Sequence, residues 1–409
     1  MTNTYNPGTG LGISSGHQVG GNMINSKLPD IGTTIFTIMS KMAADNNAVN
    51  LSQGYPDFQP PAQLLNFFRE RLLLGHNQYP PMHGIAPLRE QIALKAKRHY
   101  AAIVDEETEI TVTSGATEAI FVAVQAVVHV GDEVIIFDPA FDCYAPAIAL
   151  AGGLVRHLPL KSPSFKIDFQ RLEDTINDRT RLIIVNSPHN PCGAILSQEE
   201  IHQFEQLVEK HDVLLLSDEV YEHMVFDGRQ HHSFLSSELL RQKTFVVSSF
   251  GKTYHATGWK VAYCIAPADL TAEFRKVHQF VTFTTNTPTQ WAISDYMRAC
   301  PEHEVELAGF YESKRDRFLQ LMQGLGFAMT PSAGTYFQLA DYSSLSDLAD
   351  THFAEHLTVQ HGVAVIPISV FYRQPEQNQR IIRFCFAKEE PTLMLAAERL
   401  SQVKTDDCH

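Results

Sequence analysis

The sequence predicts an α/β protein with a mainly parallel sheet and a second, smaller α+β unit. Between residues 110 and 265, short uninterrupted apolar runs alternate with segments of helical periodicity. Strands buried on both faces appear as such continuous runs, and strands separated by helices pair mainly in parallel. The chain of 409 residues is also too long for one simple core, so two joined domains are expected.

The elements of the larger unit follow in chain order. Strands are predicted at Ile110–Thr113, Val134–Asp138, Leu154–Pro159, Leu182–Asn186, Val213–Asp218, Phe245–Ser249 and Val261–Ile265. Helices are predicted at Thr117–Val130, Tyr144–Ala151, Gln198–His211 and Gln290–Met297.

A long charged amphipathic segment, Glu302–Leu325, is predicted to be a helix that joins the two units. The smaller unit after it combines strands and helices. Its strands are predicted at Thr335–Leu339, Gly362–Pro367 and Arg380–Ala387, and its helices at Ser344–His361 and Pro391–Val403.

Composition limits the classes of function. The formal net charge of −14 argues against binding to nucleic acids or to anionic membranes. No apolar run is long enough to cross a membrane, and the Gly/Asn/Ser/Thr-rich first 26 residues indicate a flexible tail rather than a secretory signal. The six cysteines form no C-x-x-C pair, so we expect a reduced cytoplasmic protein without disulfides or structural zinc.

Polar and small residues follow four of the predicted strands directly. Asn190, Asp218 and Lys252 each follow or end a strand, and Gly115 opens a helix after the strand Ile110–Thr113. Ligands of open α/β sheets bind at the carboxyl ends of the strands, so these side chains are expected to meet there.

The set has a common chemical logic. A Gly-Ala turn at a helix start offers free N–H groups to a phosphate. A lysine forms an imine with an aldehyde, and an aspartate keeps a pyridine nitrogen protonated. An asparagine and a tyrosine can donate to a phenolate oxygen. Pyridoxal phosphate (PLP) is the common cofactor that requires this combination.

The segment SSFGKTYHATGWKVAY, at Ser248–Tyr263, resembles the lysine motif of the PLP-dependent aminotransferases of class I/II and fold type I. The segments SKLPDIGTTIFT, NLSQGYPDF, KVHQFVTFTTNTPTQ and IIRFCFAKEE extend the similarity from about Ser26 to Val403. Within the family the chain is most similar to members that act on methionine, then to those that act on kynurenine or glutamine.

The resemblance implies a role for each site residue. Lys252 is implied to form the Schiff base with PLP and to move the substrate α-proton, with Asp218 on the ring nitrogen and Tyr221 and Asn190 on the ring oxygen. Asn190 is also implied to contact the substrate. The other implied roles are phosphate binding by Gly115, Ala116, Thr117, Ser249 and Lys260, ring stacking by Phe141, and carboxylate binding by Arg383 and Gly54. Lys260 departs from the commoner arginine and supplies a point charge without a bidentate fork.

Tyr79 matches a tyrosine that reaches the phosphate of the neighbouring subunit, which implies a homodimer with shared active sites. The resemblance also implies a seven-stranded sheet and four segments. These are a tail at 1–25, an arm and part of the small domain at 26–60, a large domain at 61–300 and a small domain at 301–409. Ile35, Phe36 and Phe283 are candidates for a side-chain pocket.

Plainer interpretations remain open for single residues. Asp218 could cap a strand, Gly115-Ala116-Thr117 could simply start a helix, and Phe141 could be a core residue. Gly54 lies in a Gly-Tyr-Pro turn, and the histidines lack metal-ligand spacing, so no metal is expected.

The resemblance implies amino transfer between an L-amino acid with a large neutral side chain, methionine above all, and a 2-oxo acid. The alternative is elimination, as by a cysteine-S-conjugate β-lyase. A regulator without turnover would need a DNA-binding module, and the N-terminal tail is too short and has too few basic residues for one.

Overall fold

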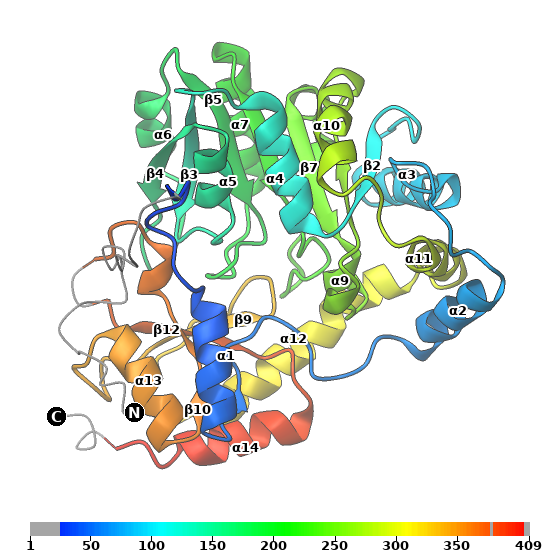
Figure 1. Cartoon of the computed structure of the whole chain (residues 1–409). Helices are drawn as coiled ribbons and strands as arrows, with labels where there is room; N and C mark the ends of the chain where they lie inside the picture. Colours follow the sequence, from blue (N-terminus) through cyan, green and yellow to red (C-terminus); the bar gives the residue numbers. More distant parts are fainter. Residues whose placement is uncertain (1–24, 377–378, 405–409) are drawn as a thin grey trace.

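The structure, a computed structural model, describes residues 25–376 and 379–404 (Figure 1). The predicted tail at 1–25 lies outside the described residues, except for its last residue. Along the described helices, none is both long and apolar enough to cross a membrane.

A seven-stranded sheet forms the larger unit, as predicted. The strands, in their order across the sheet, are β2 (Ile110–Thr113), β8 (Ala262–Ile265), β7 (Thr244–Ser249), β6 (Leu214–Asp218), β5 (Thr180–Asn186), β3 (Glu133–Asp138) and β4 (Leu154–Pro159). Strands β4, β3, β5, β6 and β7 run parallel, whereas β8 is antiparallel to both of its neighbours. The carboxyl ends of β5, β6 and β7 therefore share one edge.

Helices cover both faces of this sheet, which explains the continuous apolar runs in the sequence. On β5, Ile183 and Val185 enter the core on one face, while Leu182 and Ile184 enter the core on the other. The helices that contribute to the first core are α3 (Ala86–Tyr100), α7 (Gln198–Lys210) and α11 (Thr287–Ala299). Those of the second core are α4 (Ala116–Val127), α5 (Tyr144–Leu150) and α10 (Ala268–Val281).

The remaining helices of this unit are short or peripheral. They are α2 (Ala62–Leu73), which packs on α11, α6 (Phe169–Thr175), α8 (Glu238–Arg241) and α9 (Phe250–Thr253). Sequence periodicity did not assign α2, α3, α6 or α10. In α3 the reason is visible, because Arg89 and Lys95 are buried and interrupt its apolar face.

The smaller unit has its own core and lies beside the sheet at the lower left of Figure 1. A three-stranded sheet in the order β11 (Ile366–Pro367), β12 (Ile381–Cys385), β9 (Phe337–Asp341) is antiparallel, and β1 (Val49–Asn50) pairs in parallel with β10 (Val363–Ala364). Its helices are α1 (Ile35–Asp45), α13 (Asp350–Gln360) and α14 (Glu390–Leu400). Met39 and Leu51 share this core, so part of the N-terminal arm packs with the C-terminal unit.

Helix α12 (His303–Met322) runs between the two units, shown in yellow in Figure 1. It matches the predicted connecting helix. The predicted strand at Gly362–Pro367 is divided between β10 and β11, which pair with different strands. The helix predicted from Ser344 begins at Asp350, because the preceding chain is held in turns: Tyr342 Oη donates to Leu348 O (2.8 Å). The domain boundaries at residues 60 and 300 remain predictions.

Candidate active site

A cavity of about 260 Å³ lies at the carboxyl ends of β5, β6 and β7, where the smaller unit meets the sheet. All but one of the predicted site residues line it. They are Gly54, Gly115, Ala116, Thr117, Phe141, Asn190, Asp218, Tyr221, Ser249, Lys252, Lys260 and Arg383. A neighbouring cavity of about 570 Å³ shares Asn186 with this site, but none of the predicted residues line it. The chemistry therefore belongs to the smaller cavity.

Lys252 lies in the short helix α9 that directly follows β7. Its Nζ donates to the Tyr336 hydroxyl (2.8 Å) and to the Gly54 carbonyl oxygen (3.1 Å). Burial lowers the pKa of Lys252 to about 8, and the cations Lys260 and Arg383 act in the same direction. Neutral amine is the nucleophilic form, and this pKa makes it accessible near neutral pH.

Asp218 is the last residue of β6 and is buried. Its Oδ2 accepts a hydrogen bond from the Tyr144 hydroxyl (2.6 Å). Burial raises the pKa of Asp218 to about 6, while the bond from Tyr144 and the charge of Lys252 oppose that rise. A buried carboxylate of this kind is stabilised by a cationic partner such as a protonated ring nitrogen.

The N-terminus of α4 faces an unpaired cation. Gly115, with φ +91°, caps this helix, and a Cβ added to it would lie 2.9 Å from Cε and Nζ of Lys260. Within the described chain, no carboxylate oxygen lies within 4.0 Å of Lys260 Nζ. An ammonium group and the positive end of a helix dipole repel each other, so their convergence favours an anion between them.

Arg383 is fully buried on β12. It donates to Asn190 Oδ1 (2.8 Å) and to the Ser52 carbonyl oxygen (2.9 Å), while its Nε has no partner. The guanidinium carbon lies 3.9 Å from the ring centroid of Phe337, and burial lowers the pKa of Arg383 to about 10. Among the described residues no carboxylate oxygen lies within 4.0 Å of this guanidinium, and a buried guanidinium with an unused donor suits a ligand carboxylate.

Gly54 lies next to Lys252 and next to the Phe337 ring on which Arg383 stacks. Its carbonyl oxygen accepts from Lys252, and a Cβ at this position would lie 2.7 Å from Cζ of Phe337. A larger residue would therefore displace the aromatic ring on which Arg383 stacks. Gly54 thus has a structural reason to be glycine beyond its turn.

Two tyrosines of the site were not predicted from the sequence. Tyr336 holds Lys252, and Tyr144 holds Asp218. Neutral hydroxyls on a strand or a helix carry no sequence signal of their own, and only the charged partners identify them. Of the three candidate pocket residues, Phe36 lines the cavity, whereas Ile35 and Phe283 do not.

Tyr79 lies outside the cavity, and its side chain is 84% exposed. It packs edge-to-face on Phe283, with ring centroids 5.6 Å apart. The structure therefore does not bring Tyr79 to the site within one chain, and its role in a neighbouring subunit remains a prediction.

Comparison with known proteins identifies the family. A sequence profile described as aminotransferase class I and II matches residues 46–400. The methionine aminotransferase of Escherichia coli is 50% identical over 92% of this chain and 98% of its own length. Its crystal structure aligns with a TM-score of 0.91, at 49% identity over 93% of this chain and 99% of that one.

More distant relatives belong to the same family. The structure of N-succinyldiaminopimelate aminotransferase from Mycobacterium tuberculosis aligns with a TM-score of 0.89, at 37% identity over 93% of this chain and 100% of that one. A kynurenine–oxoglutarate transaminase of Dictyostelium discoideum is 34% identical over 91% of this chain and 94% of its length. These similarities cover nearly the whole chain, which therefore belongs to the class I and II aminotransferases of fold type I and is an aminotransferase.

Proposed function

We propose that this aminotransferase uses PLP to move the amino group of an L-amino acid with a large neutral side chain, methionine above all, to a 2-oxo acid. The observation that carries the proposal is the convergence of four features in one cavity. They are a buried lysine of lowered pKa, a buried carboxylate, an unpaired cation at a helix N-terminus and a buried arginine with an unused donor.

The residues fit the cofactor. Its phosphate would lie between Lys260 and the N–H groups of α4, with Ser249 alongside, where the two positive groups now face each other. Its ring nitrogen would face the Asp218 carboxylate, with Tyr221 and Asn190 near the ring oxygen and Phe141 against the ring. When bound, PLP supplies an aldehyde that takes up the amino group and a ring that withdraws electrons from the α-carbon.

Each residue of the site has its own role in the reaction. Lys252 Nζ would take up the proton from the substrate α-carbon and hold it for the return transfer. The Tyr336 hydroxyl and the Gly54 carbonyl oxygen hold that nitrogen in position. Arg383 fixes the α-carboxylate through its guanidinium, and Tyr144 orients Asp218.

The preference for methionine rests on similarity and on the cavity lining. Half of the aligned residues match the E. coli methionine aminotransferase. Among the described residues that line the cavity, Arg383 is the sole arginine, and Phe36 and Val220 add apolar surface. A neutral side chain fits this lining better than a second carboxylate.

The test is a single half-reaction. The PLP-loaded protein is mixed with L-methionine and no oxo acid, and its visible absorption is recorded. We expect the cofactor band to bleach and one 4-methylthio-2-oxobutanoate to form per site, with aspartate at least about 100-fold slower because its side-chain carboxylate would be buried without a partner. An unchanged band with methionine would contradict the substrate. Ammonia and pyruvate from a cysteine conjugate, without an oxo acid, would favour the lyase alternative.

A homodimer with shared sites is part of the proposal. Tyr79 packs on Phe283 and both side chains are exposed, as are Leu73 and Leu74 at the end of α2 and Phe280 at the end of α10. Exposed large apolar side chains of this kind are candidates for burial in a subunit interface. We place the enzyme in the cytoplasm, where its five described free cysteines would stay reduced.

A hybrid dimer tests the sharing. Tyr79→Ala and Lys252→Ala homodimers are each expected to lose most of their activity, because each lacks one part of every site. In a mixed dimer, one site would contain both native residues, since Tyr79 comes from the other subunit. Mixing the two variants after dissociation is expected to restore activity toward a quarter of the native value, given half hybrids and one good site in each. No recovery would show that Tyr79 serves its own chain.

A further inference from the structure

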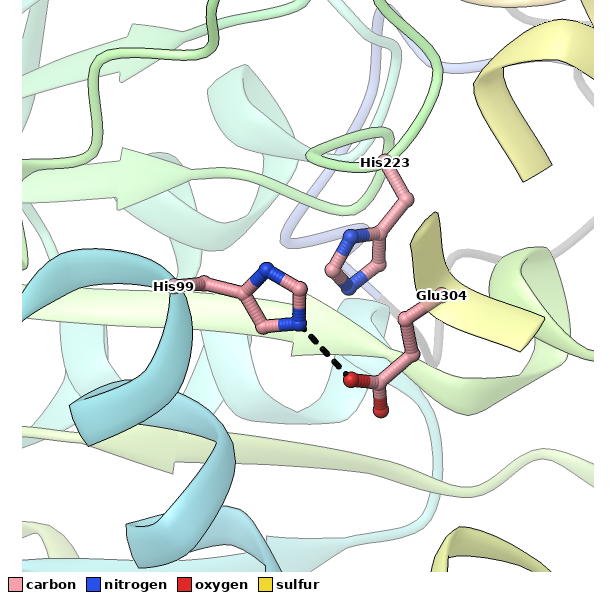
Figure 2. A group of neighbouring side chains, drawn as sticks. All are labelled: His99, His223 and Glu304. Carbon is pink, nitrogen blue, oxygen red and sulfur yellow. Dashed lines mark hydrogen bonds and ion pairs between the residues drawn. The ribbon is translucent and has the colours of Figure 1, made fainter. Parts of the chain in front are cut away.

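Three side chains outside the active site form a compact cluster of metal-ligating groups. His99 comes from the end of α3, His223 from the turn after β6, and Glu304 from the first turn of α12 (Figure 2). One ligand atom of each lies within 4.8 Å of the other two. The three segments are distant in the sequence, so only the fold creates this cluster.

Two of the ligand atoms are already adjacent. His99 Nε2 and Glu304 Oε2 lie 2.9 Å apart, as the dashed line in Figure 2 marks. Two ligands of a tetrahedral zinc lie about 3.4 Å apart, since each bond is about 2.1 Å long. Shifts of the order of 1 Å or less, within this pair as well as in His223, would therefore complete the geometry.

The third side chain has an unused atom. His223 is 9% exposed, and its buried Nε2 has no hydrogen-bond partner. Figure 2 shows this imidazole beside the pair formed by His99 and Glu304. An unsatisfied buried nitrogen is costly, and a bound ion would remove that cost.

The neighbouring charges decide whether a cation fits. Lys95 is buried and its positive charge acts on His223 and Glu304, but this charge is offset by the Glu222 carboxylate, which lies 2.6 Å away. Arg98 Nη2 donates to Glu304 Oε2 at 2.6 Å and thus competes for the same oxygen, but its side chain is 39% exposed and can move into solvent. Tyr254 donates to the other oxygen of Glu304, at 3.1 Å, and fixes the carboxylate as an outer partner of a metal ligand does.

We infer that His99, His223 and Glu304 form a binding site for a divalent transition-metal ion, Zn²⁺ by ligand type, with Arg98 occupying it when the ion is absent. Two imidazoles and one carboxylate are the ligand set of three-ligand zinc sites, with water as the fourth ligand. The bound ion would tie the start of α12 to α3 and to the turn that carries Tyr221. It would raise the melting temperature of the protein.

The experiment uses the tag-free, PLP-loaded full chain after treatment with a chelator. Calorimetric titration with Zn²⁺ is expected to give one ion per chain. Affinity should fall at least about 100-fold in His99→Asn, His223→Gln and Glu304→Gln, since even outer partners of a metal are worth about 10- to 100-fold. His202→Ala, which removes an exposed histidine of α7, serves as the matched control and should leave the affinity unchanged.

Arg98→Met separates a metal site from a purely structural cluster. This variant keeps all three ligands and removes the competing guanidinium, so it should bind Zn²⁺ more tightly than the native protein and gain more in melting temperature. Three results would each overturn the inference. They are no stoichiometric binding of Zn²⁺ to the native protein, native affinity in the three ligand variants, and binding to Arg98→Met that is weaker than to the native protein. The visible band of the cofactor shows in every variant whether the chain is folded.

Discussion

Lys252→Ala is expected to lower kcat for methionine transamination by at least about 10⁴-fold, since general acid–base catalysis alone contributes up to about that factor. The variant lacks both the amine that attaches the cofactor and the base that moves the α-proton. The two other cations that line the cavity cannot replace it, because Lys260 faces the N-terminus of α4 and Arg383 stays protonated at neutral pH. Steady-state rates with methionine and a 2-oxo acid measure the loss.

The control for this variant is Lys276→Ala. Lys276 is a surface residue of α10 whose side chain is 67% exposed and pairs with Glu273. Its removal should leave kcat within about twofold, because exposed ion pairs contribute little. Activity of Lys252→Ala within tenfold of the native value would refute the proposed role. A weak partial rescue by added small amines would support it, since they can replace the base but not its position.

Arg383→Met is expected to lower kcat/KM for methionine by roughly 30- to 4,000-fold. Truncating one partner of a buried charge pair costs about 2–5 kcal/mol, and each 1.4 kcal/mol is a factor of ten. The guanidinium is fully buried, stacks on Phe337 and has an unpartnered Nε. Arg383→Lys should fall between the native protein and the methionine variant, because it keeps the charge and loses the planar fork.

A substrate without a carboxylate shows whether Arg383→Met has lost recognition of the substrate carboxylate or has damaged the fold. The amine 3-(methylthio)propylamine differs from methionine only in lacking that group, so the native preference for methionine over this amine should largely disappear in Arg383→Met. Equal loss with both substrates would show that Arg383 serves packing rather than the carboxylate. Arg317→Met, at an exposed pair with Glu390, should leave both rates unchanged.

Much of the fold follows from local pattern. The run Ile110–Thr113 is β2 to the residue, and all four of its residues are buried, as in a strand covered on both faces. Leu154–Pro159 is likewise β4 to the residue, although β4 is a largely exposed edge strand that contains Arg156 and His157. Helix α3 was not found, since Lys95 lies in its buried face. The partner of Lys95, Glu222, is distant in the chain, and no local sequence pattern predicts such a buried ion pair.

The site divides in the same way. Lys252, Asp218 and Gly115 could be predicted because each follows a strand end, where open sheets bind ligands. Tyr144 and Tyr336 could not, because a hydroxyl gains its role only from the partner it reaches. The cluster of His99, His223 and Glu304 could not be predicted either, because the three residues are distant in the sequence and form no local metal-binding motif.

The sequence by itself determined the class of fold, the family and the chemical groups of the site, because helix and strand periodicity and the strand-end motifs are local properties of the chain. Only the tertiary structure decided which groups meet. The strand order β2-β8-β7-β6-β5-β3-β4 brings the strand ends to one edge, and the return of the smaller unit buries Arg383 against Asn190. Contacts between distant segments depend on how whole elements pack, and the free energy of that packing is not encoded in any short stretch of residues.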